Sequence, residues 1–376
     1  MIRSLHLKNF KCFESQRFEF APLTLLTGLN GMGKSSVLQS LLLLRQSYQQ
    51  GLLQNDGLSL KGELAQLGMA QDVFYEDAEG DEFGFDLDFD MVTSGDHAVS
   101  WRFNYEPEAD VVPLASPQVP KEVYEESLFN NNFHYLQAER IGPRTTFPTS
   151  DYIVRKHRQL GASGEYTAHF LQLFGSQKII NSAIAHPKEE IQTLKAQIEA
   201  WMSEVSPGVR IEITSYTDMD LIKLQYTFAI GRTVSKSHRS TNVGFGITYI
   251  LPVLVALLSS AQGSLVLLEN PEAHLHPQGQ AKLGELMARV ASCGVQVIVE
   301  THSDHVLNGI RVAVKKGLLP PEKVRLHFFG RQEEDGQVKS SVISPRMDRN
   351  GRIDQWPDGF FDQWDKSLEQ LLGWAT

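Results

Sequence analysis

Residues 28–36 combine three glycines, a lysine and two serines at a spacing that can bind phosphate. The segment reads Gly-Leu-Asn-Gly-Met-Gly-Lys-Ser-Ser and satisfies the pattern G-x-x-x-x-G-K-S. In such a loop the backbone amides face an anion, the lysine reaches the outer phosphates, and the first serine hydroxyl can bind Mg²⁺. The predicted nucleotide-binding residues are Gly28, Asn30, Gly31, Gly33, Lys34, Ser35 and Ser36, and Ser35 is also a predicted metal ligand.

A second set of chemical groups follows two apolar runs later in the chain. Residues 265–268 are apolar and lead into Glu269-Asn270-Pro271-Glu272, whereas residues 295–299 lead into Glu300-Thr301-His302. Apolar runs of this kind are typical of buried parallel strands, and ligands bind beyond the carboxyl ends of such strands. We therefore expect Glu269 to reach a Mg²⁺ bound at the phosphate loop, and His302 to lie at the same end of the sheet and sense a γ-phosphate.

The histidines in this part of the chain allow a second interpretation. His274, His276, His302 and His305 could together suggest a metal cluster. No cysteine and no H-E-x-x-H spacing supports zinc, so structural roles for these histidines are favoured.

Three further groups of polar residues are weaker candidates. Asn9, Phe10 and Lys11 interrupt the first strand near the phosphate loop and could touch the nucleotide base or ribose, or form a plain strand-edge loop. Two arginines beside a Gly-Pro turn could bind phosphate or stabilise a loop (Arg140, Arg144). The most basic short stretch could be a solvated loop or could contact nucleic acid (Arg232, Lys236, His238, Arg239).

The elements that position these residues follow from hydrophobic periodicity. We predict a strand over residues 23–26 and a helix over 36–50 around the phosphate loop, and antiparallel strands over 83–89 and 99–105. Residues 163–203 are predicted to be helical, with an apolar stripe that includes Ile191 and Leu194. A hairpin at 210–228 and a helix at 247–260 follow, and the last segments predict strands at 324–329 and 340–343 and a helix at 362–372.

Composition limits the class of protein. The chain has 376 residues, a net charge of −10 and 41% apolar residues, which indicates a globular protein with one large domain or two and argues against a broad surface that coats nucleic acid. The two cysteines lack metal-type spacing, so a reducing, cytoplasmic setting is expected. The N-terminus leads straight into strand-like sequence, and residues 250–258 are about half the length of a membrane span, so we expect no signal peptide and no membrane segment.

The order of these motifs resembles that of a known family. Asn-Phe-Lys at 9–11, the phosphate loop, Gly-Phe-Gly at 244–246, the Glu269 segment and Glu-Thr-His-Ser-Asp at 300–304 resemble the ABC-type ATPase heads of the SMC, RecF and OLD-like (AAA) group. The nearest resemblance is to small bacterial ATPases of anti-phage defence modules, which carry a C-terminal extension ending in W-P-x-G-F-F, here residues 356–361. The resemblance implies an α/β P-loop NTPase head with a mixed central sheet, an antiparallel β lobe and a short helical insertion.

The resemblance also implies roles for individual residues. Residues 28–36 would be the Walker A loop, and His302 would be the switch histidine. The loop from Val243 to Gly246 would replace the family's signature loop and contact the γ-phosphate of the opposite subunit, with Gly244, Phe245 and Gly246 as its nucleotide-binding residues. Either Gln66 or Gln137 would be the Q-loop residue.

One departure from the family pattern affects catalysis. The usual Asp-Glu-Pro is Glu269-Asn270-Pro271 here. Glu269 can still hold Mg²⁺, but Asn270 has no carboxylate and cannot act as a general base. Either Glu272 or His302 then activates the water, or hydrolysis is slow and ATP binding itself acts as the switch.

The predicted organisation has four segments. Residues 1–160 form a lobe with Walker A, 161–231 a helical and hairpin insertion, 232–320 the signature-like loop with Walker B and the switch histidine, and 321–376 a C-terminal extension. The predicted function is an ATPase that binds ATP and Mg²⁺, dimerises around ATP and switches a partner effector such as a nuclease in anti-phage defence. The alternatives are a DNA-binding ATPase of repair or recombination, and a P-loop small-molecule kinase.

Overall fold

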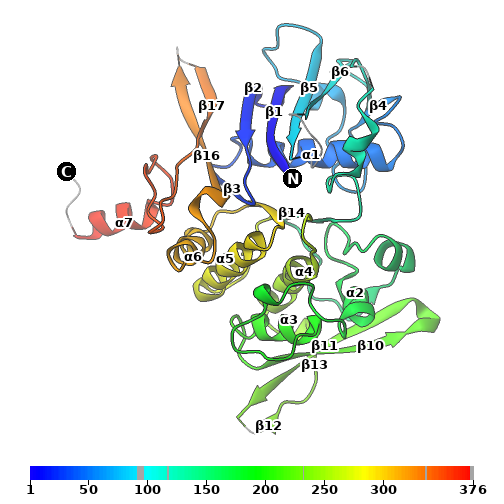
Figure 1. Ribbon diagram of the computed structural model, residues 1–376, viewed down its shortest axis with the longest axis vertical. Coiled ribbons are helices and arrows are strands. Elements are labelled where there is room, and N and C mark those ends of the chain that lie inside the picture. Colours follow the sequence, from blue (N-terminus) through cyan, green and yellow to red (C-terminus); the bar gives the residue numbers. More distant parts are fainter. Residues whose placement is uncertain (91–96, 117, 232, 335–336, 373–376) are drawn as a thin grey trace. The chain divides into compact units, whose positions relative to one another are not determined.

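Figure 1 shows the computed structural model, which describes residues 1–90, 97–116, 118–231, 233–334 and 337–372. The chain forms two compact units. Unit 1 contains residues 1–130, 324–348 and 352–376, and unit 2 contains residues 131–323 and 349–351. This division differs from the four predicted segments, because most of the C-terminal extension belongs with the N-terminal lobe and the helical insertion belongs with the Glu269 region.

Unit 1 contains an antiparallel lobe and the phosphate-loop strand. The lobe is a four-stranded sheet in the order β2-β1-β5-β6. The strand β3 pairs in parallel with β16, and β16 pairs antiparallel with β17. The strands are β1 (Ile2–Phe10), β2 (Phe13–Glu19), β3 (Leu23–Gly28), β4 (Gly57–Ser59), β5 (Glu82–Phe89), β6 (His97–Asn104), β7 (Val111–Pro113), β16 (Val324–Glu334) and β17 (Gln337–Ile343).

The described residues of unit 1 contain two α-helices, and both were predicted. They are α1 (Lys34–Gln49) and α7 (Gln363–Leu372), and the short 3₁₀ helices are η1 (Ala70–Asp72) and η2 (Lys121–Glu125). One apolar face of α1 is fully buried, including Val37, Leu38 and Leu41. Burial of this face fixes α1 against the unit and thereby fixes the end of the phosphate loop.

Unit 2 contains a parallel sheet, a hairpin and the remaining α-helices. The strands β15, β14 and β8 are parallel, and Leu265 to Leu268 of β14 are completely buried. Its strands are β8 (Phe133–Leu136), β9 (Phe147–Pro148), β10 (Val209–Tyr216), β11 (Leu221–Ile230), β12 (Thr233–Val234), β13 (His238–Arg239), β14 (Leu265–Glu269) and β15 (Gln296–Glu300). Its α-helices are α2 (Thr167–Phe174), α3 (Leu194–Met202), α4 (Phe245–Ser259), α5 (Pro277–Ser292) and α6 (Asp304–Lys315). Its short helical turns are η3 (Tyr152–Lys156), η4 (Ser182–Ile184), η5 (Thr217–Met219), η6 (Ser240–Asn242) and η7 (Pro321–Lys323).

The helices α5 and α6, which follow the two acidic strands, pack at close range. A Cβ added at Gly309 would lie 2.0 Å from the carbonyl oxygen of Ala281, and one added at Gly284 would lie 2.3 Å from that of Val306. Such short distances exclude any larger side chain, so the two glycines permit backbone-to-backbone packing of these helices. This packing holds the ends of β14 and β15, from which the helices lead away.

Two sequence-based expectations about secondary structure were wrong. Asn9 and Phe10 were expected to interrupt the first strand, but β1 continues to Phe10 because Lys8 and Phe10 pair with β2. Residues 163–203 were expected to be helical, but only α2, η4 and α3 are helical there. Ile191, which was assigned to the apolar stripe, lies outside α3 and is 59% exposed, whereas Leu194 is buried.

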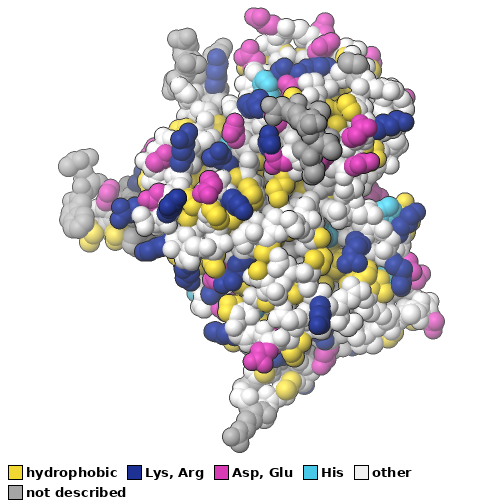
Figure 2. Space-filling view, in the orientation of Figure 1, with side chains coloured by type: hydrophobic (Ala, Val, Ile, Leu, Met, Phe, Trp, Pro, Cys, Tyr) yellow, Lys and Arg dark blue, Asp and Glu magenta, His cyan; other side chains and the backbone are white. Residues whose placement is uncertain are grey.

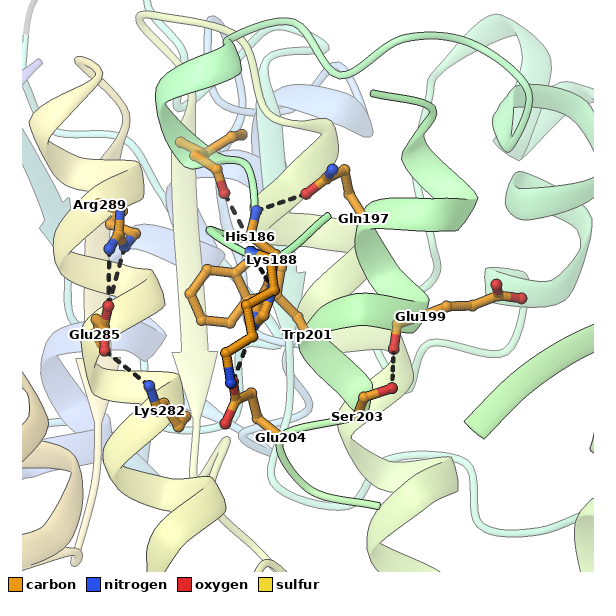
Figure 3. A network of polar contacts seen from close by, with 11 residues as sticks. His186, Lys188, Gln197, Glu199, Trp201, Ser203, Glu204, Lys282, Glu285 and Arg289 are labelled. Atoms are coloured by element: carbon orange, nitrogen blue, oxygen red, sulfur yellow. Dashed lines mark hydrogen bonds and ion pairs between the residues drawn. The ribbon is translucent and has the colours of Figure 1, made fainter. Parts of the chain in front are cut away.

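The buried side chain of Gln197 explains why the segment before α3 is not helical. Its Oε1 accepts a hydrogen bond from the backbone N–H of His186 at 2.6 Å, and its Nε2 donates to the carbonyl oxygen of Ile191 at 2.7 Å. His186 also packs against Trp201 and pairs with Glu204, as Figure 3 shows. Backbone groups that a helix would satisfy internally are therefore satisfied by one side chain of α3.

No helix among the described residues is long and apolar enough to cross a membrane.

Candidate nucleotide-binding site

The phosphate loop joins β3 to α1 and has the conformation that its glycines were expected to allow. Gly28 has a φ of 128°, and a Cβ there would lie 2.1 Å from the carbonyl oxygen of Phe329 in β16. Gly33 has a φ of 97°, and a Cβ there would lie 2.5 Å from the thiol sulfur of Cys12. Gly31 has a φ of 76° with open space around it. Two of the glycines thus fit the loop against the protein, and the third leaves room beside it.

The side chain of Lys34 is buried and lies over the loop. It is 4% exposed, and its Nζ donates hydrogen bonds to the carbonyl oxygens of Leu29 at 2.7 Å and Gly28 at 3.1 Å. The adjoining helix α1 has no side-chain cap and no acidic residue in its first turn. The first turn of α1 therefore contributes no negative charge of its own at the positive end of the helix, an arrangement that favours a bound anion.

The residues of the Asn-Phe-Lys segment serve structural contacts. Phe10 is fully buried and its ring packs against the aromatic rings of β5, so the prediction that its side chain contacts a nucleotide is wrong. Asn9 donates its side-chain amide to the carbonyl oxygen of Glu82, and Lys11 donates to the Oε1 of Gln39 in α1 at 2.6 Å. Burial lowers the pKa of Lys11. The segment therefore ties the antiparallel lobe to the phosphate-loop helix.

The carboxylate of Glu269 is held at the end of β14 in unit 2. Its Oε1 accepts a hydrogen bond from the hydroxyl of Tyr135 at 3.0 Å, and its Oε2 accepts one from the backbone N–H of Ala138 at 3.2 Å. Burial raises the pKa of Glu269, although both hydrogen bonds and the charge of Arg140 act in the opposite direction. Burial and the same carboxylate also raise the pKa of Tyr135, so its hydroxyl remains a proton donor.

Residues 269–274, called here the carboxylate turn, have an unusual backbone conformation. Asn270 has a φ of 44° and His274 a φ of 64°. Asparagine is among the residues that tolerate this left-handed region, because its short polar side chain can hydrogen-bond locally. The backbone N–H of Asn270 donates to the carbonyl oxygen of Glu300, which extends the pairing of β14 with β15 by one bond. The turn thus begins directly at the end of the parallel sheet.

Glu272 connects the turn to the loop that carries His302. Its Oε1 accepts a hydrogen bond from the backbone N–H of His302 at 2.9 Å. Its Oε2 is buried and has no hydrogen-bond partner, and the side chain is 8% exposed. A buried carboxylate oxygen without a partner is costly, which marks it as a group that can bind water or a ligand. Two of the predicted catalytic residues are therefore adjacent.

Arg140 is a loop-stabilising residue. It is 2% exposed and donates hydrogen bonds to the carbonyl oxygens of Gln137, Tyr249, Glu269 and Asn270. Burial lowers the pKa of Arg140 to about 10, so it remains charged at neutral pH. Of the two alternatives for this residue, loop stabilisation is confirmed.

The signature-like loop leads into α4. Gly244 is the N-cap of this helix and makes no side-chain cap, and Phe245 is 49% exposed. A Cβ added at Gly246 would lie 2.6 Å from the carbonyl oxygen of His274, so glycine is required where the helix meets the carboxylate turn. The ring of Phe245 lies 5.1 Å from that of His274 and 5.2 Å from that of Tyr249.

The remaining candidates are distributed over the two units. Gln137 adjoins Ala138, whose N–H holds Glu269, whereas Gln66 forms an isolated bridge with Lys61 in unit 1. Arg232 lies outside the described residues, and Lys236 and Arg239 are exposed. On the face drawn in Figure 2, lysine and arginine side chains are interspersed with acidic ones. Within the described residues, no group of three or more His, Cys, Asp and Glu could hold a metal ion, which includes the four histidines considered above.

Sequence reasoning missed the roles of Tyr135 and the Ala138 amide. Tyr135 lies in β8 and Ala138 follows it, and the apolar sequence of β8 gave no sign that this strand lies beside β14. The signal available was the polar sequence Gln-Ala-Glu-Arg directly after a short strand, which is where ligand-binding groups of parallel sheets gather.

Comparison with known proteins supports an ATPase. Residues 1–109 match the model of an AAA ATPase domain, and residues 175–308 match a AAA domain whose description names the AbiEii toxin of a type IV TA system. Residues 319–371 match DUF3696, a family described as a protein of unknown function. A comparison with curated protein sequences gives no match.

Solved structures of SMC heads have a similar fold. An SMC head bound to the C-terminal winged-helix domain of ScpA superimposes with a TM-score of 0.56 at 15% identity, and covers 91% of this chain and 98% of its own. A Pyrococcus furiosus SMC head with an extended coiled coil, bound to the C-terminal domain of ScpA, gives a TM-score of 0.52 at 14% identity and covers 99% of both chains. The chain has the mixed α/β fold of an SMC-type P-loop NTPase head, and two of its segments match AAA domain models.

Proposed function

We propose that this protein is an ATP-dependent switch that binds MgATP through the phosphate loop and the carboxylate turn. The observation that carries the proposal is the phosphate loop itself: a buried lysine folded over a glycine loop at the uncapped N-terminus of α1. The open space at Gly31 and the absence of a first-turn carboxylate fit a triphosphate.

The predicted phosphate and metal ligands each have a stated role in this proposal. Lys34 would exchange its carbonyl partners for the outer phosphates, and the amides of residues 30–36 would bind the phosphate oxygens. Ser35 and Glu269 would hold Mg²⁺, which when bound neutralises charge on the phosphate oxygens. Glu269 suits this role because each of its carboxylate oxygens has one protein donor and retains a further lone pair.

Glu272 is the proposed general base. Asn270 lacks a carboxylate, whereas Glu272 has a buried oxygen without a partner and is bonded to the backbone of His302. A water molecule bound between Glu272 and the His302 side chain would lose its proton to Glu272 Oε2, and His302 would sense the γ-phosphate. A single hydrogen bond thus joins the proposed base, Glu272, to the backbone of the proposed sensor, His302.

Dimerisation around ATP is the second part of the proposal. The Gly244–Phe245–Gly246 loop presents an exposed aromatic side chain and the uncapped N-terminus of a long helix, α4. The helix N-terminus suits contact with a phosphate of a second subunit, and the exposed ring offers that subunit an apolar surface. The similar SMC heads are bound to domains of ScpA, which supports a partner protein for this chain too.

We further propose that the switch acts in the cytoplasm on a separate effector, such as a nuclease, in anti-phage defence. The support is the match over residues 175–308 to a domain whose description names a toxin of a type IV TA system.

Steady-state ATP hydrolysis and ATP binding test this function. Lys34→Ala should abolish ATP binding and phosphate release, because the loop loses its only lysine. Glu272→Gln should bind ATP and lower phosphate release about 100-fold, the usual contribution of a general base. The ATP-dependent change from monomer to dimer, measured by light scattering, should be lost in Lys34→Ala and retained in Glu272→Gln.

Two exposed residues provide matched controls. Lys61→Ala in unit 1 and Glu322→Gln in unit 2 change the same residue types away from the site, and both should behave as wild type. Full ATP binding by Lys34→Ala would contradict the proposed site. Phosphate release by Glu272→Gln at the wild-type rate would assign the base to another residue, with His302→Ala as the next variant.

A further inference from the structure

Arg140 connects two segments of unit 2 that are far apart in the sequence. On one side, its Nη1 donates to the carbonyl oxygen of Glu269 at 2.8 Å and its Nη2 donates to that of Asn270 at 2.7 Å. On the other side, its Nε donates to the carbonyl oxygen of Tyr249 in α4 at 3.2 Å. One rigid, planar guanidinium thus binds the start of the carboxylate turn and the second turn of the signature-loop helix at the same time.

Aromatic contacts reinforce the same connection. The guanidinium carbon lies 5.3 Å from the centre of the Tyr249 ring. That ring lies 4.7 Å from the ring of His274, at the other end of the carboxylate turn, and 5.2 Å from that of Phe245. The exposed Phe245 is therefore linked to the backbone of Glu269 through Tyr249 and Arg140, and to His274 directly.

The contacts of Arg140 suit a residue that holds separate backbone segments together. All four of its acceptors are neutral backbone carbonyls, and the side chain is almost completely buried. A lysine could keep the charge, but its single ammonium group could not reproduce the fork of donors that joins Glu269 and Asn270 to Tyr249. The geometry therefore depends on arginine.

We propose that Arg140 is a positioning residue that makes the carboxylate turn and the first turns of α4 move as one body. The consequence for catalysis rests on the proposed function. When Phe245 contacts a second subunit, a displacement of this residue would also displace the Mg²⁺ ligand Glu269 and the base Glu272. ATP turnover would then depend on dimerisation through a connection inside each subunit.

Backbone hydrogen exchange of the nucleotide-free protein tests the connection without any reference to ATP. In Arg140→Lys, exchange should accelerate at least about fivefold in both the carboxylate turn and residues 245–250, because the hydrogen bonds of Arg140 hold both segments. Arg144→Lys is the matched control, since Arg144 is exposed and lies four residues away, and it should leave both segments unchanged. Acceleration in only one of the two segments would overturn the proposal.

A double-mutant cycle tests the consequence for function. Arg140→Lys should bind ATP within about twofold of wild type and hydrolyse it roughly 10-fold more slowly, as expected for a coupling of this size. Phe245→Ala should slow hydrolysis in the wild-type background and have little further effect in Arg140→Lys. Additive effects of the two substitutions would contradict the coupling.

Two further measurements keep the test decisive. If Arg140→Lys does not fold, Tyr249→Ala removes the ring that contacts Arg140, His274 and Phe245, and should accelerate exchange in the same two segments. If wild type neither hydrolyses ATP nor dimerises, the proposed function fails, whereas the hydrogen-exchange result still decides whether Arg140 joins the two segments.

Discussion

The phosphate loop and the carboxylate turn are built in opposite ways. The phosphate loop is one continuous segment whose shape depends on glycine φ angles and on strand pairing with Phe329. The carboxylate turn is held by side chains and backbone groups from separate segments, namely Tyr135 in β8 and Ala138 after it, Tyr249 through Arg140, and His302 after β15. The difference shows that the shape of the phosphate loop depends mainly on its own residues, whereas the shape of the carboxylate turn depends on tertiary contacts.

The largest expected effect comes from filling the space at Gly28. In Gly28→Ala, the new Cβ would lie 2.1 Å from the carbonyl oxygen of Phe329 at a φ of 128°, so β3 and β16 must separate. We expect a loss of about 3 kcal/mol or more in the free energy of unfolding, measured by urea denaturation. Gly31→Ala is the matched control: its φ of 76° costs about 1 kcal/mol, but nothing lies within contact distance. Equal effects of the two substitutions would show that backbone packing does not shape this loop.

An intermediate effect is expected from removing one hydroxyl beside the carboxylate turn. Tyr135→Phe deletes the hydrogen bond to Glu269 and leaves the ring in place. ATP hydrolysis should fall up to about 10-fold, the effect of one lost hydrogen bond, while ATP affinity at the phosphate loop stays unchanged. Because the hydroxyl lowers the pKa of Glu269, its loss should also move the acid limb of the pH–rate profile to higher pH. An unchanged profile would mean that Glu269 does not need this partner.

The smallest effect concerns the dependence of stability on pH. Burial raises the pKa of Glu269 above its value in the unfolded chain, so the folded state binds its proton more tightly. Stability should therefore decrease as pH rises from about 4, the unfolded value, through the folded pKa. In protein stripped of divalent ions, Glu269→Gln should lack this decrease and be at least as stable as wild type at pH 7. A greater loss of stability in Glu269→Gln at pH 7 than at pH 4 would contradict the sign.

Several parts of the molecule could be predicted because their signals are local. The pattern of glycines before Lys34 and Ser35 gave the phosphate loop, and apolar runs gave β14 and β15 with their acidic ends. The sequence-based predictions that were wrong concern residues whose contacts lie in other parts of the fold. Phe10 became a core residue through contact with β5, and the segment before α3 lost its expected helix to the side chain of Gln197.

The sequence by itself therefore determined the class of site: a phosphate loop between a strand and a helix, followed by acidic strand ends that suit a metal ion. It could do so because φ preferences, helix termini and periodicity act over a few residues. Only the tertiary structure decided that Tyr135 holds Glu269, that Glu272 keeps a buried oxygen without a partner, and that Arg140 binds carbonyls in place of phosphate. The hydrogen bonds behind these assignments join residues that are at least 30 positions apart in the sequence. Local backbone preferences carry no information at that separation, so tertiary packing selects the partner.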